Sequence, residues 1–416
     1  MRLRLPKAKI LMVLLYGSPS MWRLGFLFHE ITFGLLSVFL PLYIIRIGGT
    51  LLDIGIMTSV AMFAAIPAFF FWGYICDKTL HYKRYILISF LTSSILLCLF
   101  TLSTNIGILV TLYVVMAVFH AAHEPPKNVL IAEFYSREEW RKAYAFYEGL
   151  TEVGWLIGLI LGIFVSSLAS FSAKTTLLIC SGLNFLAFLF SLFLITDPIL
   201  VFERGLVSIE KSVEFTYKGV TIASKILEGF RVRVDLKMEN LYAFFGGLTL
   251  FSLATSTLFT PLPVFFSQDL RFPASMVFTV YVSNSAANAI GYFLISARPE
   301  QGEEKVRLQK IVLVRSFLAF FLAVVAAFPV YTTALAFLIL TLMGFAYAIY
   351  HACVLSLSME LISAGKAGLF DVLVSIGGAT GAFIGPFIAQ TWGFIYVFLL
   401  VGAIFLLAFI LFKVYS

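Results

Sequence analysis

Two carboxylates, Glu148 and Glu152, stand four residues apart within a long apolar run. On a helix, residues four apart lie on the same face, so the two side chains would be neighbours. A carboxylate that is partly withdrawn from water holds a proton more readily than an exposed one, and a neighbouring carboxylate adds to this effect. The pair is therefore a candidate for a group that binds a proton in one conformation and releases it in another.

A second stripe of ionisable side chains lies in an earlier apolar run, where His120, His123, Glu124 and Lys127 follow one another at helical spacing. Imidazoles change charge near neutral pH, which suits a proton relay or sensor. Glu124 and Lys127 have an alternative interpretation as an ion pair within one helix. The groups expected to carry a coupling proton, or to line the cavity around it, are Glu30, His120, His123, Glu124, Glu148 and Glu152.

The same segment offers ligands for a metal ion. The HxxHE pattern that ends at Glu124, with His29 and Glu30, supplies the imidazole and carboxylate groups that bind divalent transition metals. The four cysteines are scattered and form no CxxC pair, so neither a disulfide nor a thiolate site is expected. Pro125 and Pro126 also disturb the helix directly after the pattern. A metal site therefore remains an alternative, and no metal ligand is assigned.

The composition explains why charged groups in these runs are informative. Of the 416 residues, 61% are apolar and 12% are charged, and the mean hydropathy is +1.00. Apolar runs reach the length of about 20 residues with which a helix crosses a bilayer, and they lack the alternation of barrel strands. We therefore expect an all-α integral membrane protein. Twelve transmembrane helices are predicted near residues 22–45, 52–74, 84–103, 107–130, 142–168, 174–196, 240–265, 274–296, 309–328, 332–355, 366–388 and 391–413.

One long polar segment, residues 197–238, carries seven Lys and Arg residues and is too charged to cross a membrane. We predict that it is a cytoplasmic linker between two pseudo-symmetric six-helix bundles. The N-terminal bundle would comprise residues 1–196, and the C-terminal bundle residues 239–416.

The basic residues indicate the orientation. Of the 29 Lys and Arg residues, all but Arg46, Lys174 and Arg271 fall on one side of this arrangement. The positive-inside rule places that side, and both termini, in the cytoplasm of a multi-pass cell-membrane protein. The net charge of +7 then needs no nucleic acid to explain it. The first 16 residues resemble a signal peptide, but no small-residue cleavage site follows, so we expect them to be retained.

Internal spacing indicates a duplication, as in many transporters. Glu148, Gly154, Gly158 and Gly162 recur 223 residues later as Asp371, Gly377, Gly381 and Gly385, and Pro41 recurs 220 residues later as Pro261. The first span thus corresponds to the seventh, and the fifth to the eleventh. Glycines at this spacing lie on one helix face and let another backbone approach closely.

Two six-helix halves with a charged loop after the second helix resemble the major facilitator superfamily, and the resemblance covers essentially the whole chain. The loop signature of that family, a glycine, an aspartate four residues further on and several basic residues, matches Gly73, Asp77, Lys78, Lys83 and Arg84. The chain departs from it at Leu80, where a second glycine is usual, and the loop after the eighth helix has no aspartate. The resemblance implies a secondary transporter that works by alternating access.

In such a fold, the loop would act as a latch. The Asp77 carboxylate could accept hydrogen bonds from the first N–H groups of the eleventh helix and pair with Arg141. Alternatively, the basic residues only set the topology. The cytoplasmic gate is expected to comprise Gly73, Asp77, Lys78, Lys83, Arg84, Arg141 and Asp371.

The eighth and tenth helices carry amide, aromatic and imidazole groups that can hydrogen-bond or stack with a solute. The substrate cavity is expected to include Tyr281, Asn284, Asn288, Tyr347, Tyr350 and His351. A phosphorylated solute would need buried basic groups, and the embedded spans offer little beyond Lys127. An acidic half that faces an aromatic half suits a neutral, hydrophobic or cationic solute.

The leading interpretation is a secondary active transporter of a small organic solute, proton-coupled, with export favoured over uptake. Its partners would be the solute, protons and the lipid bilayer, and we expect a monomer without a cofactor. No phosphate loop or nucleophile elbow is found, which argues against an ATP-driven pump and an enzyme. The alternatives are a divalent transition-metal transporter of the same fold and a polytopic membrane enzyme of acyl-transfer type that uses His123 and Glu124.

Overall fold

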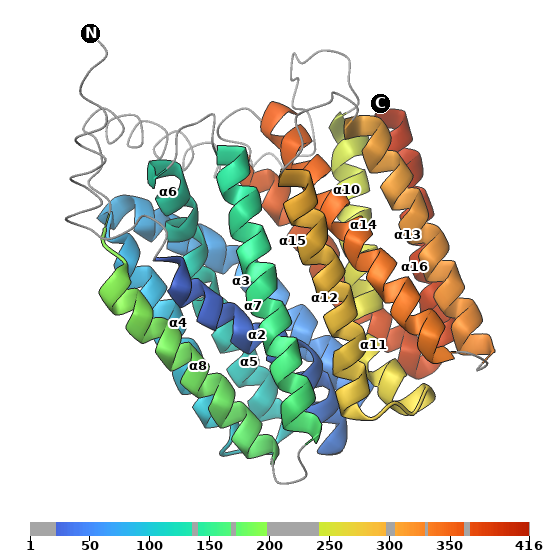
Figure 1. Ribbon diagram of the computed structural model, residues 1–416, viewed down its shortest axis with the longest axis horizontal. Helices are drawn as coiled ribbons and strands as arrows, with labels where there is room; N and C mark the ends of the chain where they lie inside the picture. Colours follow the sequence, from blue (N-terminus) through green and yellow to red (C-terminus); the bar gives the residue numbers. More distant parts are fainter. Residues whose placement is uncertain are drawn as a thin grey trace, which may run out of the picture.

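The computed structural model describes residues 22–134, 140–167, 172–197, 241–296, 304–328, 332–361 and 367–415. These residues form a bundle of long helices, and no strand occurs among them (Figure 1). The N-terminal segment and nearly all of the predicted linker, from residue 198 on, lie outside the described residues. The expected all-α fold is confirmed.

The helices of the first half follow the predicted spans. They are α2 (Arg23–Arg46), α3 (Leu51–Thr79), α4 (Tyr82–Phe100), α5 (Ile106–His120), the 3-10 turn η1 (Ala121–His123), α6 (Glu124–Phe134), α7 (Trp140–Ser167) and α8 (Ala173–Leu194). The fourth predicted span is thus divided at η1, directly before Pro125 and Pro126. A proline lacks the N–H group of a regular helical turn and crowds the turn before it, so a break is expected there.

The helices of the second half also match their predicted positions. They are α10 (Leu241–Phe259), the short α11 (Leu262–Val264), the π-helical turn η2 (Phe265–Asp269), α12 (Ala274–Ser296), α13 (Glu304–Ala327), α14 (Thr332–Leu361), α15 (Ala367–Thr391) and α16 (Phe394–Tyr415). The seventh predicted span is interrupted between Phe259 and Leu262, where Pro261 and Pro263 follow each other closely.

Eleven helical segments among the described residues are long and apolar enough to cross a membrane by length and composition. The predicted eighth span, α12, is not one of the eleven, although it has 23 residues. Its sequence carries Thr279, Asn284, Ser285 and Asn288, which lower its hydropathy. In the fold, α12 packs between α7 and α14, so these polar groups lie against protein.

Several helices begin with a side chain that caps their free N–H groups. Thr50 and Asp53 form a reciprocal capping box at the start of α3. Asn105 caps α5 and Ser172 caps α8. All three caps lie at the end of the bundle opposite the Asp77 loop, because α3 and α4 run antiparallel and α5 and α8 both begin where α4 and α7 end.

The contacts within the two halves repeat each other, as the duplication predicts. In the first half, α2 packs on α7 and α8, α4 packs on α8 and α5, and α3 packs on α5. In the second half, α10 packs on α15 and α16, α13 packs on α16 and α14, and α12 packs on α14. Each contact of one half thus has its counterpart six helices later in the other.

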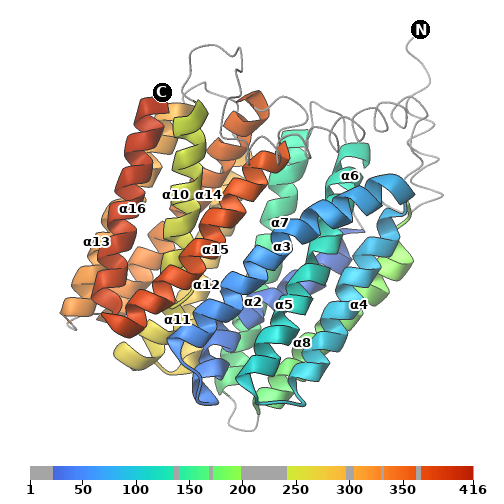
Figure 2. The ribbon, with the colours of Figure 1, turned by 180° about the vertical axis from the view of Figure 1, so that it is seen from behind.

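Two helix pairs join the halves. Figure 1 shows α7 beside α12, and Figure 2 shows α3 beside α15 from behind. When each helix is replaced by its counterpart in the other half, the α7–α12 pair becomes the α15–α3 pair. This relation is expected for two halves related by a twofold pseudo-axis. At the end opposite the Asp77 loop, the backbone N–H of Leu52 on α3 donates to Gln390 Oε1 on α15 at 2.7 Å.

Glycines allow the closest of these approaches. A Cβ atom added to Gly158 on α7 would lie 2.1 Å from the Ile31 carbonyl oxygen on α2, and one on Gly34 would lie 2.2 Å from the Trp155 carbonyl oxygen. In the second half, a Cβ on Gly385 of α15 would lie 2.1 Å from the Thr257 carbonyl oxygen of α10. The glycine ladders therefore bring two backbones into contact in each half, as expected for helix packing in a membrane.

Gly158→Ala should destabilise the protein by about 1–3 kcal/mol, because the new methyl group forces the α2 and α7 backbones apart. Gly385→Ala should do the same in the second half. The matched control is Gly182→Ala on α8, where no atom lies within 4 Å of an added Cβ. There alanine should leave the stability unchanged or raise it by about 0.5–1 kcal/mol. Thermal unfolding of the solubilised protein would measure all three, and equal midpoints for Gly158→Ala and Gly182→Ala would contradict the packing role.

Candidate functional site

His29, on α2, lies completely buried in the first half. Its Nδ1 atom is 2.7 Å from the side-chain oxygen of Asn184 on α8. The amide nitrogen of Asn184 donates to the Cys180 carbonyl, so the oxygen faces the imidazole and His29 Nδ1–H is the donor. The neutral ring then keeps a lone pair on Nε2. That buried atom has no hydrogen-bond partner among the described residues.

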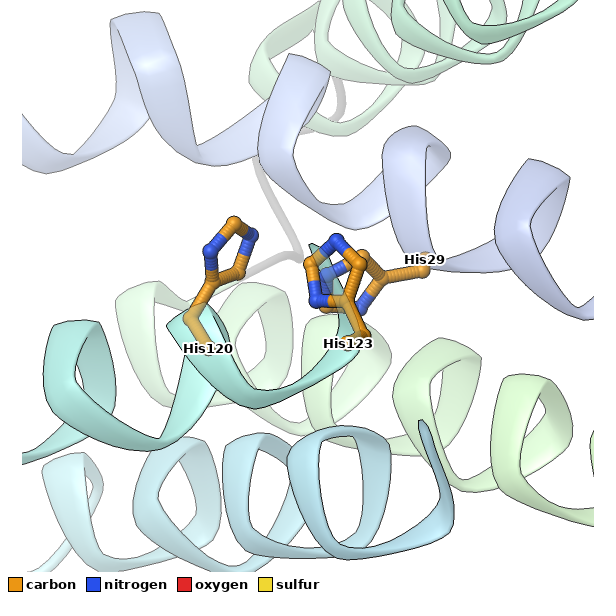
Figure 3. Close-up of side chains that lie close together, drawn as sticks. All are labelled: His29, His120 and His123. Atoms are coloured by element: carbon orange, nitrogen blue, oxygen red, sulfur yellow. The ribbon is translucent and has the colours of Figure 1, made fainter. Parts of the chain in front are cut away.

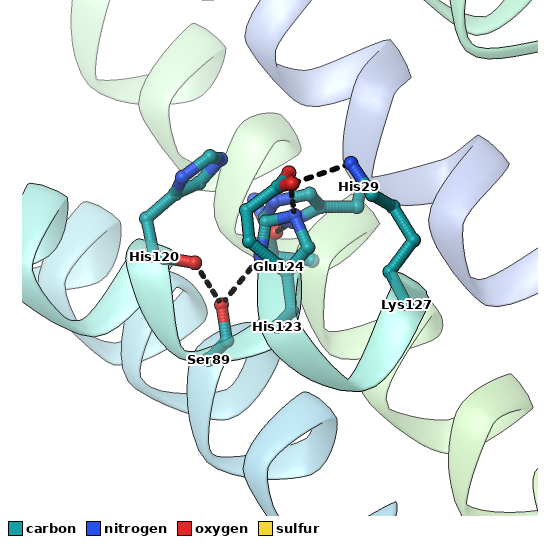
Figure 4. Close-up of polar contacts among 7 residues, drawn as sticks. His29, Ser89, His120, His123, Glu124 and Lys127 are labelled. Carbon is teal, nitrogen blue, oxygen red and sulfur yellow. Dashed lines mark hydrogen bonds and ion pairs between the residues drawn. The ribbon is translucent and has the colours of Figure 1, made fainter. Parts of the chain in front are cut away.

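His123, in η1, is also buried. Its Nδ1 atom lies 3.1 Å from the hydroxyl of Ser89 on α4, and that hydroxyl is also within 3.2 Å of the His120 carbonyl oxygen. On its other side, His123 Nε2 lies 3.2 Å from Glu124 Oε1. Figure 4 shows this chain of polar contacts running from the His120 backbone through Ser89 and His123 to Glu124.

Glu124 and Lys127 form an ion pair through Glu124 Oε2 and Lys127 Nζ (Figure 4). The pair expected within one helix is therefore present. Glu124 is not limited to this role, because its second oxygen contacts His123. The carboxylate thus connects a lysine with an imidazole, both largely removed from water.

Three imidazoles meet in this region. The rings of His29, His120 and His123 have centroids 4.6 to 4.9 Å apart, and one ligand nitrogen of each lies within 4.8 Å of the others. Figure 3 shows the ring from α2 beside the two rings from the α5–η1 segment. Phe33 and Phe90 cover the group, with ring centroids 4.6 Å from His120 and 4.4 Å from His29.

The predicted carboxylates gather around the same region. Glu30 lies within range of the charges of four side chains, which are Glu124, Lys127, Glu148 and Glu152. The close approach of α2 to α7 accounts for this, because Glu30 Cβ would lie 2.9 Å from a Cβ on Gly154. The six residues predicted to carry or surround a coupling proton thus occupy one part of the first half.

Glu152 reaches across the interface between the halves. Its Oε2 atom lies 3.2 Å from the Ser285 hydroxyl on α12, which donates to it. On the far side of the interface, Tyr347 and Tyr292 lie within range of the charges of Glu148 and Glu152. His351 also lies within range of the charge of Glu148. The structure therefore brings part of the predicted substrate group opposite the predicted proton group.

The predicted substrate residues differ in what they contact. Tyr292 OH lies 2.9 Å from His351 Nδ1, and the Tyr350 ring stacks on Phe251. Asn284 donates to the Leu340 carbonyl oxygen at 2.7 Å and so joins α12 to α14. Tyr281 and Asn288 are both buried. Of the six, Asn284, Tyr347 and His351 are half-buried.

Sequence reasoning missed three residues of these networks. Ser89 and Asn184 lie on α4 and α8, which lack ionisable groups in their interiors, yet both hold a histidine in place. A single amide in the apolar stretch around Asn184 was the available signal. The third is Arg315 on α13, which is completely buried and whose guanidinium carbon lies 4.8 Å from the Phe251 ring centre and 5.5 Å from that of Tyr347. Among the described residues, the second half thus contains one buried cation enclosed by aromatic rings.

The predicted gate lies at the end of α3. Asp77 and Lys78 are exposed, and Gly73 is half-buried one turn earlier. In the loop that follows, the Lys83 N–H donates to Asp197 Oδ1 at 2.7 Å, and Arg84 is exposed. The side chains of the predicted partners Arg141 and Asp371 lie outside the described residues, so the latch stays a prediction.

Comparisons with known proteins agree with this fold. A family model described as Major Facilitator Superfamily matches residues 24–370. The human organic anion transporter MFSD10 (TETRAN) has a solved structure that superposes with a TM-score of 0.64 at 17% identity, covering 95% of this chain and 98% of that one. A mutant of the nucleoside transporter NupG superposes with a TM-score of 0.64 at 16% identity, covering 96% and 100%. No curated protein sequence matches the chain.

The hydrogen bond between His29 and Asn184 should contribute measurably to stability. Asn184→Leu leaves the buried Nδ1–H group without an acceptor, which should cost about 1–3 kcal/mol. His29→Leu should cost a similar amount by leaving Asn184 unpaired. The double variant should be more stable than the sum of the single effects predicts, because two apolar groups then replace the pair. Thermal unfolding of the four proteins would measure the coupling, and additive effects would refute it.

Proposed function

Because this chain belongs to the major facilitator superfamily, we propose that it is a proton-coupled transporter of a small organic solute, with Glu152 as the principal proton-carrying group. The family and the superposed structures are those of membrane transporters, which supports a secondary transporter rather than an enzyme. The coupling ion, the class of solute and the direction are inferences from the site.

The hydrogen bond between Glu152 and Ser285 is the observation that carries the proposal. Glu152 belongs to the first half and Ser285 to the second, and their side chains meet at 3.2 Å. In alternating access the halves move relative to each other, so a contact between them is made in one state and broken in another. A half-buried carboxylate that loses a donor becomes easier to protonate. Proton binding at Glu152 and the position of the halves would therefore depend on each other.

The charges behind Glu152 support a route for the proton. Glu148 lies one helical turn away on α7, and Glu30 lies within range of both carboxylates. Lys127 offsets part of this negative charge through its ion pair with Glu124. A proton taken up at Glu152 would therefore remain near groups that can share it, within one half of the protein.

The groups opposite these carboxylates favour an organic solute that is neutral or cationic. The rings of Tyr347 and His351 stack on each other with centroids 6.0 Å apart and place aromatic, hydrogen-bonding groups within range of the acidic side chains. MFSD10 and NupG are named for organic solutes, which supports the same general class. MFSD10 is named for organic anions, but we do not propose an anionic solute for this chain. An anion would need an accessible basic group, and Arg315 is completely buried and enclosed by aromatic rings. We propose export rather than uptake as the direction.

The acyl-transfer alternative has no support in the geometry. His123 would have to act as a base, yet it is 1% exposed and both ring nitrogens contact protein side chains. The divalent-metal alternative depends on the histidine group, which is a separate site from the Glu152 contact.

Glu152→Gln should abolish solute movement driven by a pH gradient and leave solute counterflow measurable. Glutamine keeps the volume and a hydrogen bond to Ser285 but cannot release a proton. Glu148→Gln is the matched control one turn away and should retain most of the coupling. Both would be compared with the wild type in proteoliposomes. Full gradient-driven transport by Glu152→Gln would reject the assignment of the proton to this residue.

We also propose that the end of the bundle with the Asp77 loop faces the cytoplasm of a cell membrane. In a variant whose four native cysteines are replaced, Leu102→Cys should then react with an impermeant thiol reagent added outside intact cells. His81→Cys should react only after the membrane is opened. Both positions are exposed in the fold, so accessibility within the protein is matched. The reverse pattern would overturn the orientation.

A further inference from the structure

The group of His29, His120 and His123 contains an atom that proton coupling at Glu152 does not use. His29 Nε2 is buried and has no hydrogen-bond partner among the described residues, and the centroid of its ring lies 4.9 Å from those of His120 and His123. A buried polar atom without a partner normally costs free energy, and such atoms are rare in folded proteins. A positively charged ligand at the centre of the three rings would give this lone pair a partner.

The geometry is close to that of a metal site. Two nitrogen atoms bound to one zinc ion at about 2.0–2.1 Å lie about 3.4 Å apart in a tetrahedron and cannot be more than about 4.2 Å apart. The ligand nitrogens here lie within 4.8 Å of one another. Ring rotations that move them by about an ångström would therefore suffice.

The surrounding hydrogen bonds are those that a metal-binding imidazole needs. Such a ring usually donates its second N–H to a carbonyl or carboxylate, which fixes the tautomer and the ring plane. His29 donates Nδ1–H to Asn184, which leaves the lone pair of Nε2 free for a ligand. His123 can donate Nδ1–H to Ser89, which in turn donates to the His120 carbonyl oxygen. Both rings are then oriented with a free lone pair on Nε2.

Glu124 is placed to supply a fourth ligand. In the tautomer just described, His123 Nε2 and Glu124 Oε1 are two acceptors that face each other at 3.2 Å. A proton or a cation must lie between them. The separation is close to the distance of about 3.3 Å between two ligands of one tetrahedral ion. Three imidazoles and one carboxylate favour Zn²⁺, Co²⁺ or Ni²⁺ over the hard ions Mg²⁺ and Ca²⁺.

All these ligands come from the first half, from α2, η1, the end of α5 and the start of α6. A movement of one half against the other would therefore leave them together. An ion held in this way would stay bound throughout a transport cycle, unlike a solute whose ligands come from both halves. From these observations we infer that His29, His120 and His123 form a resident binding site for a divalent transition-metal ion, with Glu124 completing the ligand set.

Cobalt titration of the full chain would test this site. The protein, purified without a polyhistidine tag and treated with a chelator, should bind one Co²⁺ and develop the intense visible absorption of a four-coordinate ion. Zn²⁺ should displace the Co²⁺ and raise the unfolding temperature, because it binds only the folded state. His29→Ala and His123→Ala should each abolish the absorption. Asn184→Leu, which keeps all ligands, should weaken Co²⁺ binding by about 10- to 100-fold.

The remaining histidines provide matched controls. His81→Ala and His351→Ala remove imidazoles outside the group and should leave Co²⁺ affinity and the spectrum unchanged. The wild-type spectrum needs no variant to fold, so a weak spectrum of a six-coordinate ion, or no binding, would overturn the site. Equal affinity in the wild type and in a folded His29→Ala variant would overturn it as well. Net movement of Zn²⁺ into proteoliposomes would refute the resident ion and identify it as cargo.

Discussion

The contact between the backbones of α2 and α7 is the constraint on which the candidate site depends. Gly34 and Gly158 leave no room for a side chain at the crossing, since added Cβ atoms would lie 2.2 Å and 2.1 Å from carbonyl oxygens of the other helix. In lipid, apolar side chains gain little by leaving one apolar medium for another, so close van der Waals contact carries the association. The same crossing places Glu30 of α2 beside the acidic face of α7. Packing and charge placement therefore have one origin.

The two halves share their framework and differ in their buried charges. The crossing of α10 and α15 repeats that of α2 and α7, with Gly385 against the Thr257 carbonyl oxygen. The side chain of Asp371, the counterpart of Glu148, lies outside the described residues. Among the described residues of the second half, Arg315 on α13 lies over the aromatic rings of Phe251, Tyr347 and Phe405. The duplication is thus seen in the contacts that hold each half together, whereas the described buried charges differ between the halves.

Much of the fold follows from the sequence because the bilayer leaves few choices. Apolar runs of sufficient length must be helices, and the glycine spacing predicted which helix faces let another backbone approach closely. Glu30, His120, His123, Glu124, Glu148 and Glu152 lie in one part of the first half, as expected because ionisable groups in spans avoid lipid. That they carry or surround a coupling proton stays a prediction. Asn184 and Ser89 could not be assigned in the same way. An amide or hydroxyl is tolerated on many helix faces, so only the rotation of α8 and α4 shows which imidazole each one meets.

The seventh span differs in structure from the first span, although the internal repeat aligns their sequences. Pro41 and Pro261 occupy equivalent positions, but α2 continues through Pro41 to Arg46, while α10 ends at Phe259 and is followed by α11 and the π-helical turn η2. Pro263, two residues after Pro261, removes a further N–H donor. A π-helical turn carries one residue more per turn than the α-helix. The second half therefore has an irregular segment around Phe265, whereas α2 is one continuous helix. A change of direction in that segment would alter one side of the pathway while the other side kept its shape.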